Sequence, residues 1–537
     1  MQPYRRLWPS PAGVHVEVTE PADRVVDLLL DGRRVWSFRE PAEPADAAGL
    51  PAGLPDDVDP GQLRFQPWPE SLRRLLSGTF SVELRPLGTD AGVTTETSLG
   101  GDPGPLRLVD VHDRPLVVNK WGRLGHALAD APAGMIDRML DSMDRVRELL
   151  EEHLGPVVYV TGGTLLGPVR EDGHVMPHDD DADLAYLSRR SHPADVALEA
   201  FDVGRLLCAA GFEVIRLSVA HVQVLVSHDG VPDHYVDVFS GFHLEGWWYQ
   251  HFPIRARVGV ERLLPPSRLL VEGRDEPAPR EPEVMLEELF GTGWRVPDPA
   301  FTFDVPAETG DRLYGWFADY NVDREGWEDE VLLAPRATGT VLPEPSDFAA
   351  WVDGHAPAGH ALLELGCGRG RDAAALAARG RTVRAVDYSR YAVQDARRLA
   401  DALPGEAAPA LEVLNLLDTR AVVRLGAELA SAPGPWSVHG RRLLNAIEDR
   451  GRDNVFRLCG MLLRGGGAAR FDVVADHGYA GVPGHRHLTV SQLVTEAARH
   501  RLELTATEQV VEPFTWLDVP VEEPVPLTRL TFTRRSR

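Results

Sequence analysis

Two aspartates in the segment DADLAYL have the spacing of a metal-binding pair. Because side chains alternate along a strand, Asp181 and Asp183 would project from the same face. Upstream, the apolar run VVYV leads into Gly162, Gly163 and Thr164, a turn whose backbone could approach a phosphate closely. Carboxylates beside such a turn suit phosphoryl or nucleotidyl transfer assisted by Mg²⁺ or Mn²⁺, because the ion neutralises charge on the phosphate oxygens.

A third acid, Asp237, lies inside the apolar run HYVDVFSGF, where an ionised carboxylate is costly without a cation. A second strand beside the first would bring Asp237 to the same ion or to an attacking hydroxyl. Two other interpretations compete, a solvated acidic turn and a calcium loop, although the glycine and final glutamate of an EF-hand are missing. His174 and His178 flank the acids and could also ligate a metal, but histidines in such a position are more often solvated.

A second group of residues predicts a nucleotide-binding turn. The segment HALLELGCGRGRDAAALAARGRTVRAVDYS gives a strand, a turn with Gly366, Gly368 and Gly370, a helix, and a second strand that ends at Asp387. The dinucleotide-binding fingerprint would need glycine where Arg371 stands. The turn therefore predicts a fold of the dinucleotide-binding kind with a cofactor other than NAD.

The elements that must position these residues fall into three predicted domains. Residues 1–120 carry alternating strand patterns and a hairpin signal at Asp31 and Gly32. Residues 121–335 open with an amphipathic helix and then mix helix and strand patterns. Residues 336–537 alternate strand and helix, which is typical of a mostly parallel sheet. The predicted fold class is an α/β multidomain protein with a β-rich N-terminal module.

Composition narrows the functional classes. The 537 residues carry a formal net charge of −25, which argues against a nucleic acid as partner. Lys120, the only lysine among 56 basic residues, could contact a phosphate or a substrate, or be a surface lysine. Three widely spaced cysteines favour neither disulfides nor a cysteine-rich zinc site. Because no signal peptide or transmembrane run is recognised, the expected compartment is the cytoplasm.

Four ordered motifs within residues 135–300 resemble the LicD/fukutin family of nucleotidyltransferase-fold enzymes: GGTLLGPVRE, PHDDDADL, VDVF and LEELFGTGWRVP. The resemblance implies transfer of a phosphorylated alcohol, such as phosphocholine, phosphoethanolamine or a polyol phosphate, from a CDP-linked donor to a glycan hydroxyl. It implies that Asp181 and Asp183 are metal ligands, with Asp179 able to join them, and that Asp237 is the third acid.

The same resemblance implies a phosphate-binding turn at Gly162, Gly163 and Thr164, and a phosphate contact from Arg170. The family usually has tryptophan before the acidic run, where this chain has His178. That departure leaves the identity of the donor open.

The ELGCGRG…VDYS arrangement, followed by strand candidates near the C-terminus, resembles the class I S-adenosylmethionine-dependent methyltransferases over residues 345–537. The resemblance implies a Rossmann-like domain in which Asp387 holds the ribose hydroxyls of the cofactor and Asn415 lies near the adenine. The other residues that it assigns to the cofactor are Glu364, Gly366, Gly368 and Gly370.

The residues that serve the methyl acceptor are less defined. His439 is the candidate general base, since imidazole titrates near neutral pH, and His477 is a second candidate. Arg441 could steer an anionic acceptor. A surface role competes with each of these assignments.

These expectations describe a bifunctional enzyme that modifies a cell-surface glycan or glycolipid, such as a teichoic acid, from the cytoplasm or at the membrane through a lipid-linked substrate. The expected partners are a CDP-linked donor and a glycan acceptor, and the expected cofactors are Mg²⁺ or Mn²⁺ and S-adenosylmethionine. The alternatives left open are a nucleotidyltransferase acting on a small molecule such as an antibiotic, an RNA-modifying enzyme, and a scaffold with one inactive catalytic domain.

Overall fold

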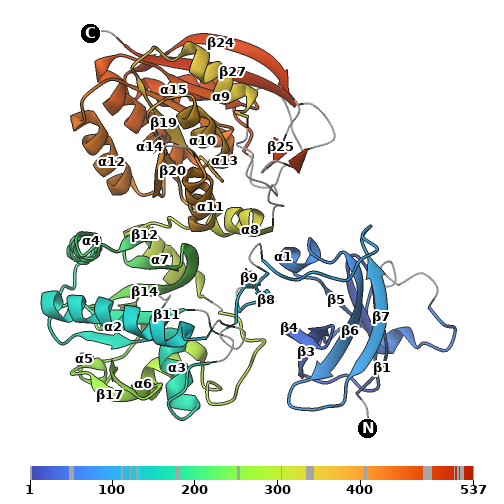
Figure 1. The fold of residues 1–537 in the computed structure, drawn as a ribbon. Helices are drawn as coiled ribbons and strands as arrows, with labels where there is room; N and C mark the ends of the chain where they lie inside the picture. The colour runs from blue at the N-terminus through green and yellow to red at the C-terminus, as the bar shows by residue number, and fades with distance from the viewer. Residues whose placement is uncertain are drawn as a thin grey trace. The chain divides into compact units, whose positions relative to one another are not determined.

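The chain gathers into two compact units in the computed structural model (Figure 1). The first comprises Met1–Val203 and His234–Phe317, and the second comprises Gly204–Asp233 and Ala318–Arg537. Among the described residues, no helix is both long and apolar enough to cross a membrane. The structure describes residues 3–46, 54–110, 113–120, 122–127, 131, 133–176, 179, 181–250, 254–303, 305–333, 344–403, 408–475, 486–512, 515–516, 519–520 and 525–535.

The chain begins with the β-rich module that the sequence predicts. One antiparallel sheet has the order β1–β2–β5, and another has the order β4–β3–β6–β7. Asp31 and Gly32 take positive φ angles of 49° and 75° in the turn between β3 and β4, as the hairpin signal predicts. The elements are β1 (Tyr4–Pro9), β2 (Gly13–Val18), β3 (Val25–Leu30), β4 (Arg33–Arg39), β5 (Leu63–Pro67), α1 (Glu70–Arg73), β6 (Gly78–Pro86) and β7 (Val93–Leu99).

The strands that carry Asp183 and Asp237 lie in the first unit, like the β-rich module. β11 pairs antiparallel with β10 and parallel with β14, and β15 and β16 add two antiparallel strands beside β14. Helix α2 buries one stripe of apolar residues, as its periodicity predicts. Helix α3 follows β10 directly and packs against β11 and α6. The bounds are α2 (Met135–Leu154), β10 (Val158–Val160), α3 (Gly162–Arg170), β11 (Ala182–Leu187), α4 (Pro193–Ala209), β14 (Val231–Leu244), β15 (Trp247–Gln250), β16 (Ile254–Ala256), α5 (Val260–Leu263), β17 (Ser267–Val271), β18 (Arg274–Ala278), α6 (Pro282–Phe290) and α7 (Ala307–Phe317).

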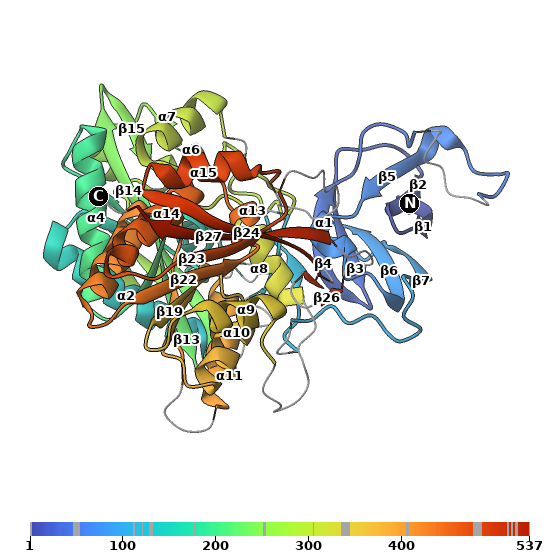
Figure 2. The same cartoon turned by 90° about the horizontal axis from the view of Figure 1, so that it is seen from above.

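The second unit is built around a seven-stranded sheet of order β21–β20–β19–β22–β23–β27–β24. The first five strands are parallel, and β27 runs antiparallel to both β23 and β24, which lie beside it in Figure 2. This Rossmann-like sheet confirms the predicted fold class. Its elements are α9 (Asp347–His355), β19 (Ala361–Leu365), α10 (Arg371–Ala378), β20 (Val383–Asp387), α11 (Arg390–Asp401), β21 (Ala410–Val413), α12 (Thr419–Ser431), β22 (Trp436–Arg441), α13 (Leu443–Ala446), α14 (Asp449–Leu462), β23 (Ala469–Val473), α15 (Val490–Ala498), β24 (Leu502–Glu512), β25 (Thr515–Trp516), β26 (Val519–Pro520) and β27 (Val525–Arg534).

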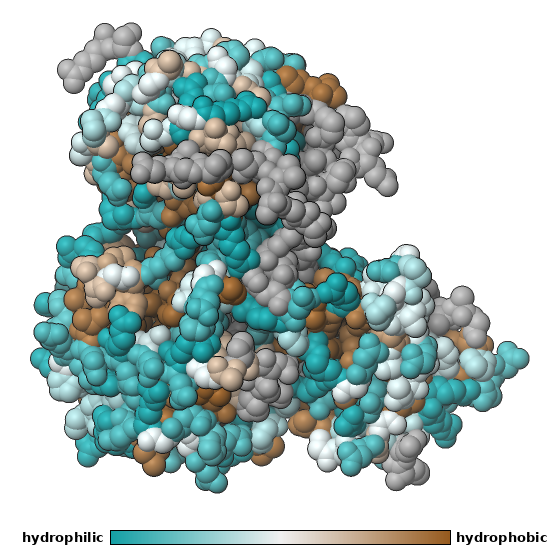
Figure 3. All heavy atoms as spheres, in the orientation of Figure 1, coloured by the Kyte–Doolittle hydropathy of each residue, from teal (hydrophilic) through white to brown (hydrophobic). Residues whose placement is uncertain are grey.

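Two segments from earlier in the chain belong to the second unit. They are the antiparallel hairpin of β12 (Glu213–Ser218) and β13 (His221–His228), and helix α8 (Arg324–Leu333). The predicted boundaries of three domains stay predictions, since the two units group the chain differently. On the face shown in Figure 3, hydrophilic residues predominate, in keeping with a chain that is 26% charged.

Candidate functional sites

The parallel pairing of β11 and β14 brings three acids together in the first unit. Asp183 and Asp237 stand opposite each other in the register, and Asp181 lies just before β11. One carboxylate oxygen from each of the three lies within 4.8 Å of the others. Asp183 and Asp237 are buried. The sequence predicted this arrangement from the alternation of DADLAYL and from the apolar surroundings of Asp237.

The glycine turn at the start of α3 presses against these carboxylates. A Cβ atom at Gly162 would lie 2.3 Å from Asp183 Oδ2, and one at Gly163 would lie 1.8 Å from Asp179 Oδ2, so a side chain at either position would displace a carboxylate. The Gly163 N–H donates to Asp183 Oδ2 at 2.8 Å, and the Asp183 N–H donates to Thr164 Oγ1 at 2.8 Å. The turn predicted to bind phosphate therefore also fixes the orientation of Asp183.

Electrostatics in this cluster call for a cation. Burial, together with the neighbouring Asp179 and Asp237, raises the pKa of Asp183 to about 7, although Lys120 and the Gly163 N–H oppose the rise. Lys120 Nζ lies 3.4 Å from Asp179 Oδ1. Carboxylate oxygens gathered at this spacing are the ligands that Mg²⁺ and Mn²⁺ prefer, so the residues present fit a divalent ion.

Other residues predicted for this site lie elsewhere. Arg170 ends helix α3, about 12 Å along the axis from Gly162, and donates to Glu171, to the Trp294 carbonyl and to Met176 Sδ. His174 is exposed and lies 3.3 Å from the carboxylate of Glu272. The structure thus brings neither Arg170 nor His174 to the acids, and His178 falls outside the described residues.

The second candidate site surrounds the glycine turn between β19 and α10. Gly366, Gly368 and Gly370 take positive φ angles of 68°, 52° and 75°, the left-handed region that favours glycine. Asp387 ends β20 and accepts hydrogen bonds at 2.9 Å from the N–H groups of Gly368 and Ser389. Burial raises the pKa of Asp387, while these backbone donors lower it. The backbone of the turn and of Ser389 therefore holds this carboxylate in place, and its role toward a ribose stays a prediction.

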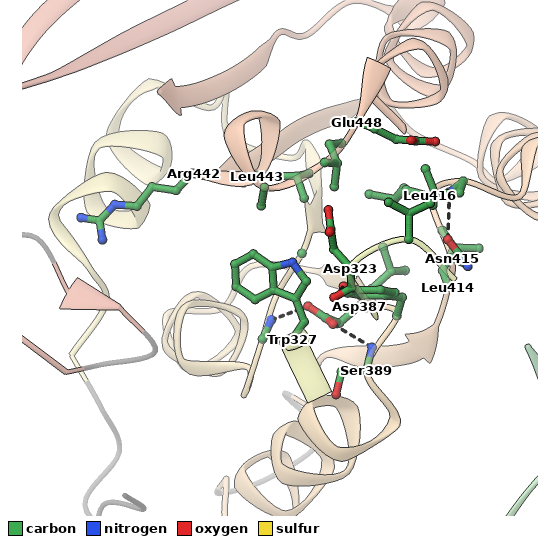
Figure 4. Close-up of a pocket in the computed structure, with 18 of the residues that line it drawn as sticks. Asp323, Trp327, Asp387, Ser389, Leu414, Asn415, Leu416, Arg442, Leu443 and Glu448 are labelled. Atoms are coloured by element: carbon green, nitrogen blue, oxygen red, sulfur yellow. Dashed lines mark hydrogen bonds between the residues drawn. The ribbon is translucent and has the colours of Figure 1, made fainter. Parts of the chain in front are cut away.

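A cavity of about 160 Å³, partly open to solvent, lies against this turn. Its walls include Gly366, Gly368, Asp387 and the residues that follow β21. Four further wall residues precede the Rossmann-like sheet in the chain: Val322, Asp323, Trp327 and Val331. In Figure 4, Asp323 and Trp327 lie beside Asp387 in this cavity. These two residues, which lie in the aromatic run RLYGWFADYNVDREGW, were not identified from the sequence.

Asn415 lines the cavity, but its amide group is already engaged. Its Nδ2 donates to the Tyr320 carbonyl at 2.6 Å and to the Arg216 carbonyl at 3.4 Å, and its Oδ1 accepts from the Leu417 N–H at 2.9 Å. Arg216 lies on β12 and its guanidinium is 3.6 Å from Asp418. Asn415 thus connects the cavity wall to the β12–β13 hairpin.

Glu364 and His439 face each other across β19 and β22 inside the sheet. Their side chains approach to 3.9 Å and both residues are buried. Burial raises the pKa of Glu364 well above its usual range and lowers that of His439 to about 4. Neither is among the residues that line the cavity, whereas Arg441 is. The base role of His439 stays a prediction, and His477 falls outside the described residues.

Two family models match this chain. Residues 156–281 match the LicD/FKTN/FKRP nucleotidyltransferase domain, and residues 363–416 match a methyltransferase domain. Both resemblances predicted from the sequence are confirmed by these matches. No curated protein matches the chain.

Several solved methyltransferase structures resemble part of the chain. One from Anabaena variabilis, described as S-adenosylmethionine-dependent, is 14% identical and covers 39% of this chain and 92% of its own, with a TM-score of 0.30. Magnesium protoporphyrin IX methyltransferase from Synechocystis is 13% identical and covers 42% of this chain and 100% of its own, with a TM-score of 0.28. A methyltransferase from Streptomyces caelestis is 16% identical and covers 39% of this chain and 96% of its own, with a TM-score of 0.28.

Proposed function

We propose that this chain, which joins a LicD-type nucleotidyltransferase domain to a methyltransferase domain, is a bifunctional glycan-modifying enzyme. Its first activity transfers a phosphorylated alcohol from a CDP-linked donor to a glycan hydroxyl. Its second methylates the same product or a related group. The observation that carries the proposal is the cluster of Asp181, Asp183 and Asp237 within 4.8 Å, beside a glycine turn at the start of a helix.

In the first reaction, the acceptor hydroxyl oxygen attacks the phosphorus that bears the alcohol. The bond from that phosphorus to the bridging oxygen breaks, and CMP leaves with that oxygen and the electron pair. We assign the hydroxyl proton to Asp237. A divalent ion held by Asp181 and Asp183, with Asp179 able to join them, would supply charge neutralisation on the phosphate oxygens. Gly163 orients Asp183 for this role through its backbone N–H.

In the second reaction, a lone pair of the acceptor attacks the methyl carbon of S-adenosylmethionine. The carbon–sulfur bond would break with the electron pair staying on sulfur, and the proton of the acceptor would pass to water. The residues present fit this cofactor, because Asp387 presents a fixed carboxylate to the cavity, where it can accept hydrogen bonds from ribose hydroxyls. The chain's own contribution is positioning, since direct displacement needs an aligned donor and acceptor.

Nucleotide release tests the first activity. The full chain would be incubated with Mg²⁺ and each of CDP-choline, CDP-ethanolamine, CDP-glycerol, CDP-ribitol, CTP and ATP, alongside the Asp181→Ala variant. CMP released from one CDP-alcohol, and lost in the variant, is the expected result. Pyrophosphate released from a triphosphate would instead support the nucleotidyltransferase that acts on a small molecule. No release from any nucleotide, even with crude glycan added, would overturn the proposed transfer.

A further inference from the structure

One cation reaches the acid cluster from outside the segment that matches the nucleotidyltransferase family. Lys120 follows β8 (Val117–Val118), thirty-six residues before the matched segment begins at position 156. Its Nζ lies 3.4 Å from Asp179 Oδ1, and its side chain is 26% exposed. It is the single lysine in a chain of 537 residues. This ammonium is thus near an acid of the site and partly accessible to an incoming ligand.

The turn that carries Lys120 is closed by its own hydrogen bonds. The Asn119 N–H donates to the Arg123 carbonyl at 2.8 Å, and the Gly122 N–H donates to the Asn119 carbonyl at 2.9 Å. The Asn119 side chain accepts from the Arg123 N–H at 3.2 Å. β8 pairs antiparallel with β9 (Leu124–Gly125) beyond this turn. Lys120 is therefore presented from a short hairpin, so little ordering is needed when a ligand arrives.

The chemistry of the site favours an anionic ligand for this ammonium. A divalent ion on Asp181 and Asp183 would repel Lys120 from the acids, and a bridging anion would then relieve the repulsion. An ammonium is a compact point charge with three donors, which suits phosphate oxygens close to a metal ion. Every other basic side chain among the 56 is an arginine, whose planar fork needs more room.

We propose that Lys120 binds the diphosphate group of the nucleoside-diphosphate donor, opposite the divalent ion held by the acid cluster. The β-rich N-terminal region thereby supplies one residue of the transferase site. This inference rests on the proposed function. The ion pair with Asp179 holds the ammonium at the site until the donor takes its place.

The single lysine makes a labelling test specific. The full chain would be treated with an amine-acylating reagent, and modification of Lys120 would be followed by mass spectrometry, with an added lysine-containing peptide as the internal reference. CDP with Mg²⁺ should slow the acylation of Lys120 about tenfold and leave the reference unchanged, because the ammonium is then engaged by phosphate. ADP, GDP and UDP in parallel arms would show which nucleosides the site accepts.

Calorimetry of nucleotide binding provides the second readout. Lys120→Met should weaken binding of CDP in the presence of Mg²⁺ by about 10- to 100-fold, the loss expected for a charge-assisted hydrogen bond. Lys120→Arg keeps the charge and should recover part of the affinity. The matched control is Arg107→Ala, which removes an exposed cation from the same region, paired with Asp113, and should bind CDP as the unmodified chain does.

The outcomes separate the two proposals. Normal binding of CDP with no protection of Lys120, or equal affinities for Lys120→Met and the unmodified chain, would overturn the role of Lys120 alone. Binding of CDP without CMP release from any CDP-alcohol would overturn the proposed transfer and leave Lys120 as a diphosphate ligand. Absence of binding by all four nucleoside diphosphates would overturn both.

Discussion

The acid cluster of the first unit and the cavity of the second use carboxylates in opposite ways. Asp181, Asp183 and Asp237 stand within 4.8 Å of one another, so their charges repel until a cation arrives. Asp387 instead accepts two backbone N–H groups in a cavity whose other walls are largely apolar. The acids of the first site thus favour a cation, whereas the carboxylate of the second is already oriented by the backbone. Metal removal should therefore affect only the first.

The two sites share one feature despite this difference. Each includes residues from outside the segment that matches a family model, Lys120 in the first and Asp323 and Trp327 in the second. The matched motifs supply the chemistry that resemblance can identify. The residues beyond them are where this chain's own specificity would be found, because loops and connectors vary more than the scaffold that carries them.

The largest expected effect is a loss of CMP release that leaves the second site unaffected. Asp183→Asn keeps an acceptor for the Gly163 N–H but removes the charge that a divalent ion needs. CMP release should fall by about a thousandfold or more, while calorimetry should find unchanged affinity for S-adenosylhomocysteine. The control is Asp275→Asn, which removes an exposed acid paired with Arg268 on the neighbouring hairpin. Loss of S-adenosylhomocysteine binding in Asp183→Asn would contradict the independence of the two sites.

A substitution in the cavity of the second unit should have the opposite pattern of effects. Asp387→Ala removes the carboxylate that accepts from Gly368 and Ser389, and with it the acceptor for the ribose hydroxyls. Affinity for S-adenosylhomocysteine should fall about a hundredfold, since two charge-assisted hydrogen bonds are lost. CMP release should stay within about twofold of the unmodified chain. Unchanged affinity would show that the cavity binds another kind of ligand.

A smaller effect on cofactor affinity is expected from Trp327, one of the wall residues of the cavity. Trp327→Ala removes an aromatic wall and should weaken binding of S-adenosylhomocysteine about tenfold, in line with the loss of one aromatic contact. Trp351→Ala is the matched control, because Trp351 packs against Phe348 and His355 and does not line the cavity. Equal affinities for the two variants would exclude a ligand contact from Trp327.

The smallest effect is on stability and depends on pH. The pKa of Asp183 is raised to about 7 by burial, above the 3.8 of the unfolded group, so the folded state binds this proton more tightly. Its contribution to stability is full below about pH 4 and is lost as the pH rises through 7. Without metal, the difference in melting temperature between Asp183→Asn and the unmodified chain should therefore widen between pH 5.5 and 8.

Calorimetric scans at both pH values, with EDTA or with Mg²⁺, would measure this linkage. Mg²⁺ should raise the melting temperature of the unmodified chain by about 2–4 °C at pH 8, less at pH 5.5, and hardly at all in Asp183→Asn. An equal rise at both pH values would show that the ion binds away from Asp183.

Local patterns predicted the parts of each site that lie on single elements. Alternation in DADLAYL was enough to place Asp181 and Asp183 on one face, and the apolar run around Asp237 was enough to mark that acid. Strand period and the cost of burying a charge are local properties. The glycine turn and Asp387 followed in the same way from a strand, a turn and a strand.

Contacts between distant segments could not be predicted in that way. Trp327 lies in a stretch whose aromatic residues favour a packed helix but do not indicate what they pack against. Lys120 was notable only as the single lysine, and nothing in its neighbours indicates Asp179, fifty-nine residues later. Arg170 is the opposite case, a residue whose motif implies a role that its contacts do not show. The motif implies a phosphate contact, whereas Arg170 donates to Glu171 and to the Trp294 carbonyl.

The hairpin of β12 and β13, tied to Asn415 through the Arg216 carbonyl, bears on how such a protein could have been assembled in evolution. The second unit comes from two stretches of the gene, Gly204–Asp233 and Ala318–Arg537, separated by residues of the first. A single recombination event between positions 234 and 317 would carry away the larger stretch and leave the hairpin behind. An exchange of the second unit as a whole would therefore need breaks on both sides of each stretch.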